Sequence, residues 1–204
     1  MLGRLLSPVR WLVTMEIGIW RSLFLLVTRR VAGQGEGVRP VPYAKEMAPV
    51  IGAFIFVSVL ELPLVHLLIP WDAVRLVVLV LSVWGVLWMV GLLASMKVFP
   101  HLIENERLRV RHGTTVDVAL PWEAVAEVRA RRGSVPTQAR VHVDGTAVSV
   151  PVLKRTNVAV VLHGPVTLAL PDGPREVTEV RLFADDPRAF VAAARERLPA
   201  AGRR

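Results

Sequence analysis

The sequence predicts an α+β membrane protein in which a transmembrane α-helical hairpin precedes an antiparallel β-barrel or β-sandwich of about seven strands, closed by a C-terminal helix. Residues 47–69 and 73–96 are nearly continuous apolar runs, whereas the chain after Pro100 alternates apolar and polar side chains in short segments. Apolar helices of about 20 residues cross a hydrocarbon core of ~30 Å, and alternation is the pattern of half-buried strands. A single uniform soluble domain does not fit this division.

Composition excludes two other classes of protein. The 204 residues are 53% hydrophobic and include no cysteine. The apolar content is too high for a disordered chain, and the absence of cysteine excludes a disulfide framework and a thiolate metal site. Arginine outnumbers lysine 22 to 3 in an Ala-, Val- and Gly-rich chain, which we interpret as the coding bias of a high-GC bacterium.

The distribution of charge predicts the topology. Residues 1–46 and 99–204 each carry a net charge of +4, and residues 47–98 are neutral. Basic residues flank the outer ends of both apolar runs, whereas the tip between the runs has only Arg75 against Asp72. Because positive charge marks the cytoplasmic side, we expect both termini in the cytoplasm of a bacterial cell, the hairpin in its inner membrane, and no signal peptide.

The first 30 residues predict an amphipathic helix at the membrane interface. On a helical wheel, Arg10, Thr14, Arg21 and Thr28 form a narrow polar stripe opposite a broad apolar face, and tryptophans suit the headgroup level. A third span and packing against the cytoplasmic domain are the alternatives. The Gly- and Pro-rich residues 31–46 predict a linker.

A carboxylate near mid-bilayer marks the first apolar run. Antiparallel packing would bring Glu61 level with Ser82, so we expect a protonated Glu61 to hydrogen-bond Ser82 or a second copy of the chain. The alternative function is a subunit of an oligomeric transport or proton-linked assembly that uses Glu61, with His66 five residues further on.

Residues 99–198 predict the β-domain. Two-residue turn signals at His112-Gly113 and Asp144-Gly145 separate alternating segments. Asp186 is the expected N-cap of the final helix, with Pro187 at its first position. Residues 199–204 are an expected disordered tail.

Four segments of this domain resemble bacterial pleckstrin-homology-like domains, namely residues 107–113, 120–125, 128–131 and 183–191. In small bacterial membrane proteins such domains commonly follow a pair of transmembrane helices. The resemblance implies a domain that contacts lipid, peptide or protein and is typically not catalytic.

The candidate binding residues are arginines on two predicted strand faces. They are candidates for contact with anionic lipid: Arg107, Arg109, Arg111, Arg129, Arg131 and Arg132. A solvated strand face is the alternative. The histidines show no metal-binding spacing and no serine lies in a nucleophile elbow, so we expect no enzyme, cofactor or metal, and no nucleic-acid partner. The sequence thus predicts a membrane-anchored interaction or scaffold protein with an unknown protein partner or a second copy.

Overall fold

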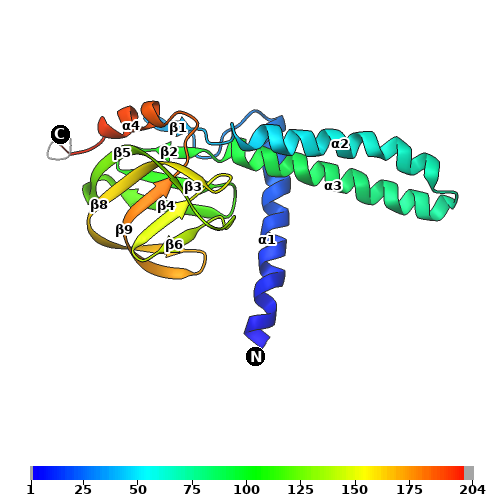
Figure 1. Cartoon of the computed structure of the whole chain (residues 1–204), viewed down its shortest axis with the longest axis horizontal. Helices are drawn as coiled ribbons and strands as arrows, with labels where there is room; N and C mark the ends of the chain where they lie inside the picture. The colour runs from blue at the N-terminus through cyan, green and yellow to red at the C-terminus, as the bar shows by residue number, and fades with distance from the viewer. Residues whose placement is uncertain (1, 200–204) are drawn as a thin grey trace.

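The computed structural model describes residues 2–199, and it describes their side chains except at positions 2–12 and 66. The chain forms a β-domain from which two helices project side by side, while a third helix crosses their base (Figure 1). The predicted tail at 199–204 lies almost wholly outside the described residues.

The projecting pair is α2 (Met47–Leu68) and α3 (Asp72–Val98), antiparallel and joined by Ile69, Pro70 and Trp71. Both are long and apolar enough to cross a membrane, and α1 does not meet that criterion in its described part. Only 6% of the apolar window of each helix is buried. This exposure differs from that of a soluble core helix, whose apolar face is covered.

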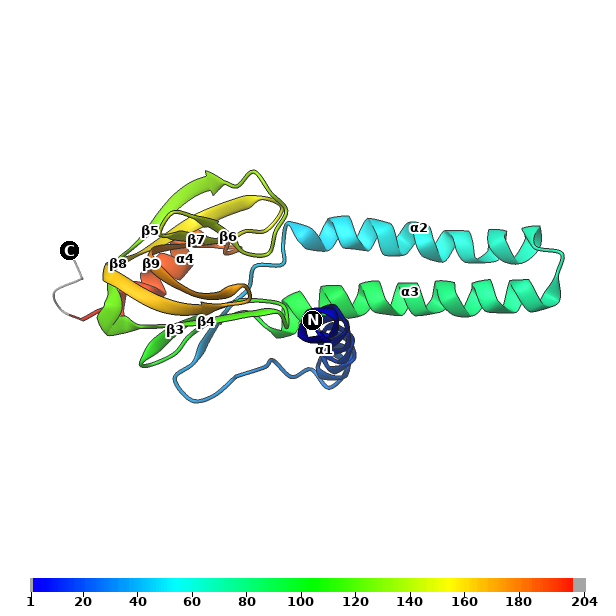
Figure 2. The ribbon, with the colours of Figure 1, turned by 90° about the horizontal axis from the view of Figure 1, so that it is seen from below.

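Helix α1 (Leu2–Val27) runs across the hairpin rather than alongside it: it is perpendicular to α2 and α3 in Figure 1 and is seen end-on in Figure 2. Gly18, Ile19 and Ser22 are buried on it. A Cβ on Gly18 would collide with the Thr114 side chain of the β-domain. One side of α1 therefore rests on the domain. The opposite side exposes an apolar stripe: Val13, Ile17, Trp20, Phe24 and Val27.

Within the described residues, nine strands form two sheets. The first sheet has the order β1-β2-β3-β4 and contains β1 (Arg39–Val41), β2 (His101–Ile103), β3 (Arg107–His112) and β4 (Val116–Pro121). The second has the order β5-β8-β9-β7-β6 and contains β5 (Val125–Ser134), β6 (His142–Asp144), β7 (Ala147–Val150), β8 (Arg155–Leu170) and β9 (Gly173–Leu182). A 3-10 turn at Trp122–Ala124 links the sheets.

The prediction of an antiparallel barrel or sandwich of about seven strands was therefore only partly correct. The structure has nine strands in two sheets that do not close into a barrel, and β7 pairs with β9 in parallel. In the second sheet β9 lies between β7 and β8, and it pairs in parallel with β7 and antiparallel with β8. Strand β1 comes from the predicted linker. β8 is one long strand whose pairing with β9 has a register shift between Val161 and Val166.

The core lies between the two sheets and is closed by α4 (Pro187–Arg195). The Asp186 side chain caps this helix, since it accepts hydrogen bonds from the backbone N–H groups of Arg188 and Ala189 at 3.0 and 2.9 Å. Phe190 and Leu198 are buried against the sheets. The predicted N-cap of the final helix is confirmed.

Candidate functional site

The three arginines of β3 are engaged within the protein. Arg107 lies 2.6 Å from Glu104, Arg109 forms an ion pair with Asp117, and the hydrogen bond with Asp117 raises the pKa of Arg109. Arg111 is buried, and its Nη1 donates to a backbone carbonyl of the segment before β1 at 2.9 Å. Neighbouring carboxylates thus neutralise this strand face, and Arg111 is not on the surface.

The three arginines of β5 are exposed but differ in their partners. Arg129 lies 3.8 Å from Glu127, and Arg131 lies 3.1 Å from Glu179. Arg132 forms no ion pair with any described side chain. The β5–β8 register shifts between Ala130 and Gly133, which takes Arg131 and Arg132 out of the regular ladder. Both line a large open cleft.

This basic cleft has a volume of about 1100 Å³ and is formed by four segments that are far apart in the sequence. It lies between the C-terminal end of β5, the start of β8, the start of α4 and the two residues before α2. Its charged lining residues are Lys45, Glu46, Arg131, Arg132, Arg155, Asp185 and Arg188. Five are basic and two are acidic, so the cleft has a net positive charge.

Two hydrogen bonds join the segment before α2 to the segment before α4. The backbone N–H of Asp185 donates to the carbonyl oxygen of Pro42, and the Asp185 carboxylate accepts from the backbone N–H of Lys45, each at 2.9 Å. Sequence reasoning missed Lys45, Arg155 and Arg188 because only the fold brings these isolated basic residues together.

The cleft retains unneutralised cations. Arg155 lies 3.5 Å from Glu46, whereas Lys45, Arg132 and Arg188 form no ion pair within the described part of the chain. Guanidinium groups bind carboxylate and phosphate oxygens through paired N–H donors. The same described part contains no group of three or more residues positioned to hold a metal ion. The arrangement is chemically suited to binding an anion.

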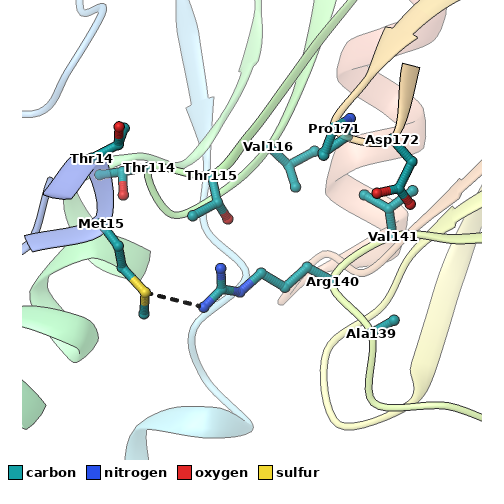
Figure 3. A pocket seen from close by; sticks show the side chains of 10 residues that line it. All are labelled: Thr14, Met15, Thr114, Thr115, Val116, Ala139, Arg140, Val141, Pro171 and Asp172. Carbon is teal, nitrogen blue, oxygen red and sulfur yellow. Dashed lines mark hydrogen bonds between the residues drawn. The ribbon is translucent and has the colours of Figure 1, made fainter. Parts of the chain in front are cut away.

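A second hollow, of about 330 Å³, lies between α1 and the β-domain (Figure 3). Thr14 and Met15 of α1 face the β3–β4 turn across it. Arg140 extends toward α1, and its Nη2 lies 4.0 Å from the Met15 sulfur. Its lining is more apolar than that of the basic cleft, and its contacts join α1 to the domain. We therefore place the candidate site in the basic cleft.

His101 connects the first sheet to the segment before α4. Its Nδ1 accepts from the Arg111 backbone N–H at 3.0 Å, so its Nε2 carries the proton and donates to the Phe183 carbonyl oxygen at 2.9 Å. Burial lowers the pKa of His101 to about 4. The folded domain therefore favours the neutral form of His101.

Tyr43 joins the segment before α2 to the same sheet. Its ring lies 4.6 Å from that of His101 and 5.8 Å from that of His112, between ring centroids. Its hydroxyl accepts from the Gly113 backbone N–H at 2.6 Å. Tyr43 is fully buried, and burial raises its pKa. This cluster fixes the entry to the hairpin onto the β-domain.

Helix α1 is bound to α3 through a carboxylate and two indoles. Glu16 accepts hydrogen bonds from the Nε1 atoms of Trp20 on α1 and Trp88 on α3, at 3.0 and 3.1 Å. Trp20 also meets Trp84 edge to face, with ring centroids 5.3 Å apart. The two helices are in close contact at Gly91, since a Cβ there would collide with Ile19 Cγ2.

Replacing Gly91 with Ala should loosen the crossing of α1 over α3. The added methyl would also lie 3.2 Å from the Ile19 backbone oxygen, so α1 must move at a cost of about 1–3 kcal/mol. Because the chain has no cysteine, a single Ser22→Cys at this buried position reports the change as faster maleimide labelling. Gly85→Ala is the matched control, since a Cβ at Gly85 meets nothing within 4 Å. Equal labelling in both variants would contradict this contact.

Glu61 and Ser82 do not meet in the structure. Glu61 is exposed on α2, Ser82 is half-buried on α3, and no hydrogen bond joins them. Glu61 also has no partner among the side chains that the structure describes, which do not include that of His66. The role of Glu61 in a second copy of the chain stays a prediction.

Comparison with protein-family models, with curated proteins and with solved structures finds no match, so the resemblance to pleckstrin-homology-like domains stays a prediction.

Proposed function

We propose that the chain is a non-enzymatic interaction module anchored in the bacterial cytoplasmic membrane, whose pleckstrin-homology-like β-domain binds anionic phospholipid headgroups through the basic cleft. The observation that supports this most is the position of Lys45, Arg132 and Arg188, which lack ion pairs within the described part of the chain and line a cleft beside the first turn of α2. If α2 crosses the bilayer, this cleft lies at the level of the headgroups.

The arrangement of the helices agrees with such an anchor. A hairpin that crosses the membrane along its axis places α1 in the plane of the membrane, since α1 runs across the hairpin (Figures 1 and 2). The exposed stripe of α1, from Val13 to Val27, lies opposite the side that contacts the domain. It would therefore face the acyl chains, which is how interfacial amphipathic helices bind.

Removing two cations from the cleft should weaken binding of anionic lipid by roughly 30-fold, since each contributes about 1 kcal/mol near a membrane surface. The variant is Arg132→Gln/Arg188→Gln in the full chain in detergent. Native mass spectrometry would count bound short-chain phosphatidylglycerol against phosphatidylcholine. Arg107→Gln/Arg195→Gln is the matched control, because it removes the same charge outside the cleft.

Two results would overturn the lipid proposal. One is equal binding of the anionic and the zwitterionic lipid by the unmodified chain. The other is equal loss in the two double variants, which would show that only net charge matters. An acidic peptide tested in the same assay distinguishes a protein partner: peptide binding that requires Arg132 and Arg188, without lipid binding, would assign the cleft to an acidic protein segment.

A further inference from the structure

A small cavity of about 70 Å³ lies at the start of α2 and shares no lining residue with the basic cleft. We call it the joint cavity. The residues that matter for its chemistry are Met47, His112, Gln138, Arg140, Leu153 and Lys154. One water molecule needs about 15 Å³ of such volume, so the joint cavity has room for a ligand of several heavy atoms.

His112 lines this cavity and carries an unsatisfied polar atom. Its Nδ1 is shielded from solvent and has no hydrogen-bond partner. One face of its ring is covered by Tyr43, and the positive charge of Arg140 lies near it. A buried polar atom without a protein partner is costly, so a ligand that hydrogen-bonds this atom would stabilise the fold.

The other polar side chains of the joint cavity are mainly donors. Arg140 and Lys154 are cationic, Gln138 carries an amide NH₂ group, and none of the lining residues is acidic. Met47 is the first residue of α2, whose first turn has no side-chain cap. The positive end of a 22-residue helix therefore adds to the same field. A ligand that accepts hydrogen bonds and carries negative charge is complementary to this lining.

The turn that carries Lys154 has an unfavourable backbone. Leu153 and Lys154 both adopt positive φ, at 47° and 64°, between Val152 and Arg155, which exchange backbone hydrogen bonds of 3.0 and 2.9 Å. Residues with a Cβ adopt this conformation at a cost of about 1 kcal/mol or more each. The fold therefore tolerates a strained turn here, and this turn lines the same cavity as Met47 at the start of α2.

We propose that the joint cavity binds a phosphate-like tetrahedral oxyanion, with the Nδ1–H of His112 and the ammonium group of Lys154 as donors. Inorganic phosphate and the phosphate group of a lipid share this chemistry. The bound anion would fix the start of α2 to the β3–β4 turn and to the segment containing Arg140. This site is distinct from the basic cleft and does not depend on the function proposed for it.

Histidine ring resonances of the ¹⁵N-labelled full chain in zwitterionic lipid nanodiscs test the proposal. Phosphate should shift the His112 resonance, assigned from His112→Gln, and raise its pKa from about 4 by about one pH unit or more, because the anion stabilises the imidazolium against the nearby Arg140 and Lys154. Neither the buried His101 nor the exposed His163 should respond. Lys154→Gln should weaken the effect about fivefold or more. The matched control is Lys45→Gln in the basic cleft, which should leave the phosphate effect on His112 unchanged.

The source of the anion follows from two arms of the same experiment. A response to inorganic phosphate supports a soluble anion, and a response only to short-chain phosphatidic acid supports a lipid phosphate. No response of His112 to either one overturns the proposal, as does an equal response in Lys154→Gln and the unmodified chain. Gln138→Leu provides a second variant if Lys154→Gln does not fold.

Discussion

Tyr43→Ala should lower the free energy of unfolding of the β-domain by about 3–5 kcal/mol, the range for truncating a fully buried aromatic ring. Tyr43 is completely buried, and its ring contacts those of His101 and His112. Truncation removes this packing and leaves the backbone N–H of Gly113 without its acceptor. The segment that enters α2 would then lose its main attachment to the first sheet.

Tyr43→Phe separates the two contributions to this effect. It keeps the ring packing and removes the hydroxyl, so it should cost about 1–3 kcal/mol for the unpaired Gly113 N–H. Intrinsic fluorescence during thermal unfolding of the full chain gives the comparison, and the Ala variant should melt more than about 10 °C below the native chain. Hydrogen exchange at the Gly113 amide should accelerate in both variants. Equal destabilisation by Phe and Ala would show that the ring contributes no stability.

Acidification from pH 6.5 to pH 4 should destabilise the domain by up to roughly 3 kcal/mol for each of two histidines, the buried His101 and the half-buried His112. Burial lowers the pKa values of His101 and His112 from 6.5 to about 4. The unfolded chain therefore takes up protons at a higher pH than the folded chain does. The contribution of the neutral histidines is complete above pH 6.5 and is lost progressively as the pH falls toward 4.

Melting temperatures between pH 7 and pH 5 measure this loss before most carboxylates titrate. Protonation of His101 would also cost the hydrogen bond that its Nδ1 accepts from the Arg111 backbone N–H. His163→Gln is the control, because His163 is exposed and its replacement should leave the pH profile unchanged. A melting temperature that stays constant from pH 7 to pH 5 would contradict the neutral state of both histidines in the folded domain.

Local signals in the sequence predicted those elements whose structure depends on neighbouring residues. The apolar runs fix α2 and α3, Gly113 and Gly145 adopt the positive φ that their turns require, and Asp186 caps α4. Each of these features follows from a few consecutive residues. The helix at the start of the chain was also predictable, because its polar stripe and broad apolar face repeat with helical spacing.

Pairings between residues that are far apart in the chain could not be predicted from local sequence patterns. Residues 39–41 look like a linker because Gly and Pro surround them, yet they pair with β2 about 60 residues later. The parallel pairing of β7 with β9 depends on which strand inserts between two others, and no local pattern encodes it. Likewise, the arginines of β3 alternated as expected, but Glu104 and Asp117 pair with them only in the folded domain. The cleft at Lys45, Arg132 and Arg188 arises from the same long-range folding.

The pairing of β1 with β2 determines how the β-domain is attached to the helical hairpin. β1 leads into α2 and β2 follows α3, and the two strands are hydrogen-bonded neighbours, with Arg39 opposite Ile103 and Val41 opposite His101. The two ends of the hairpin that adjoin the domain are therefore connected to neighbouring strands of one sheet. If one helix slid along the other, the hydrogen bonds between β1 and β2 would break. This pairing fixes the position of the β-domain relative to the hairpin, so the domain is not attached through a flexible linker. A ligand that binds the domain would therefore meet a preorganised surface, and little orientational entropy would be lost on binding.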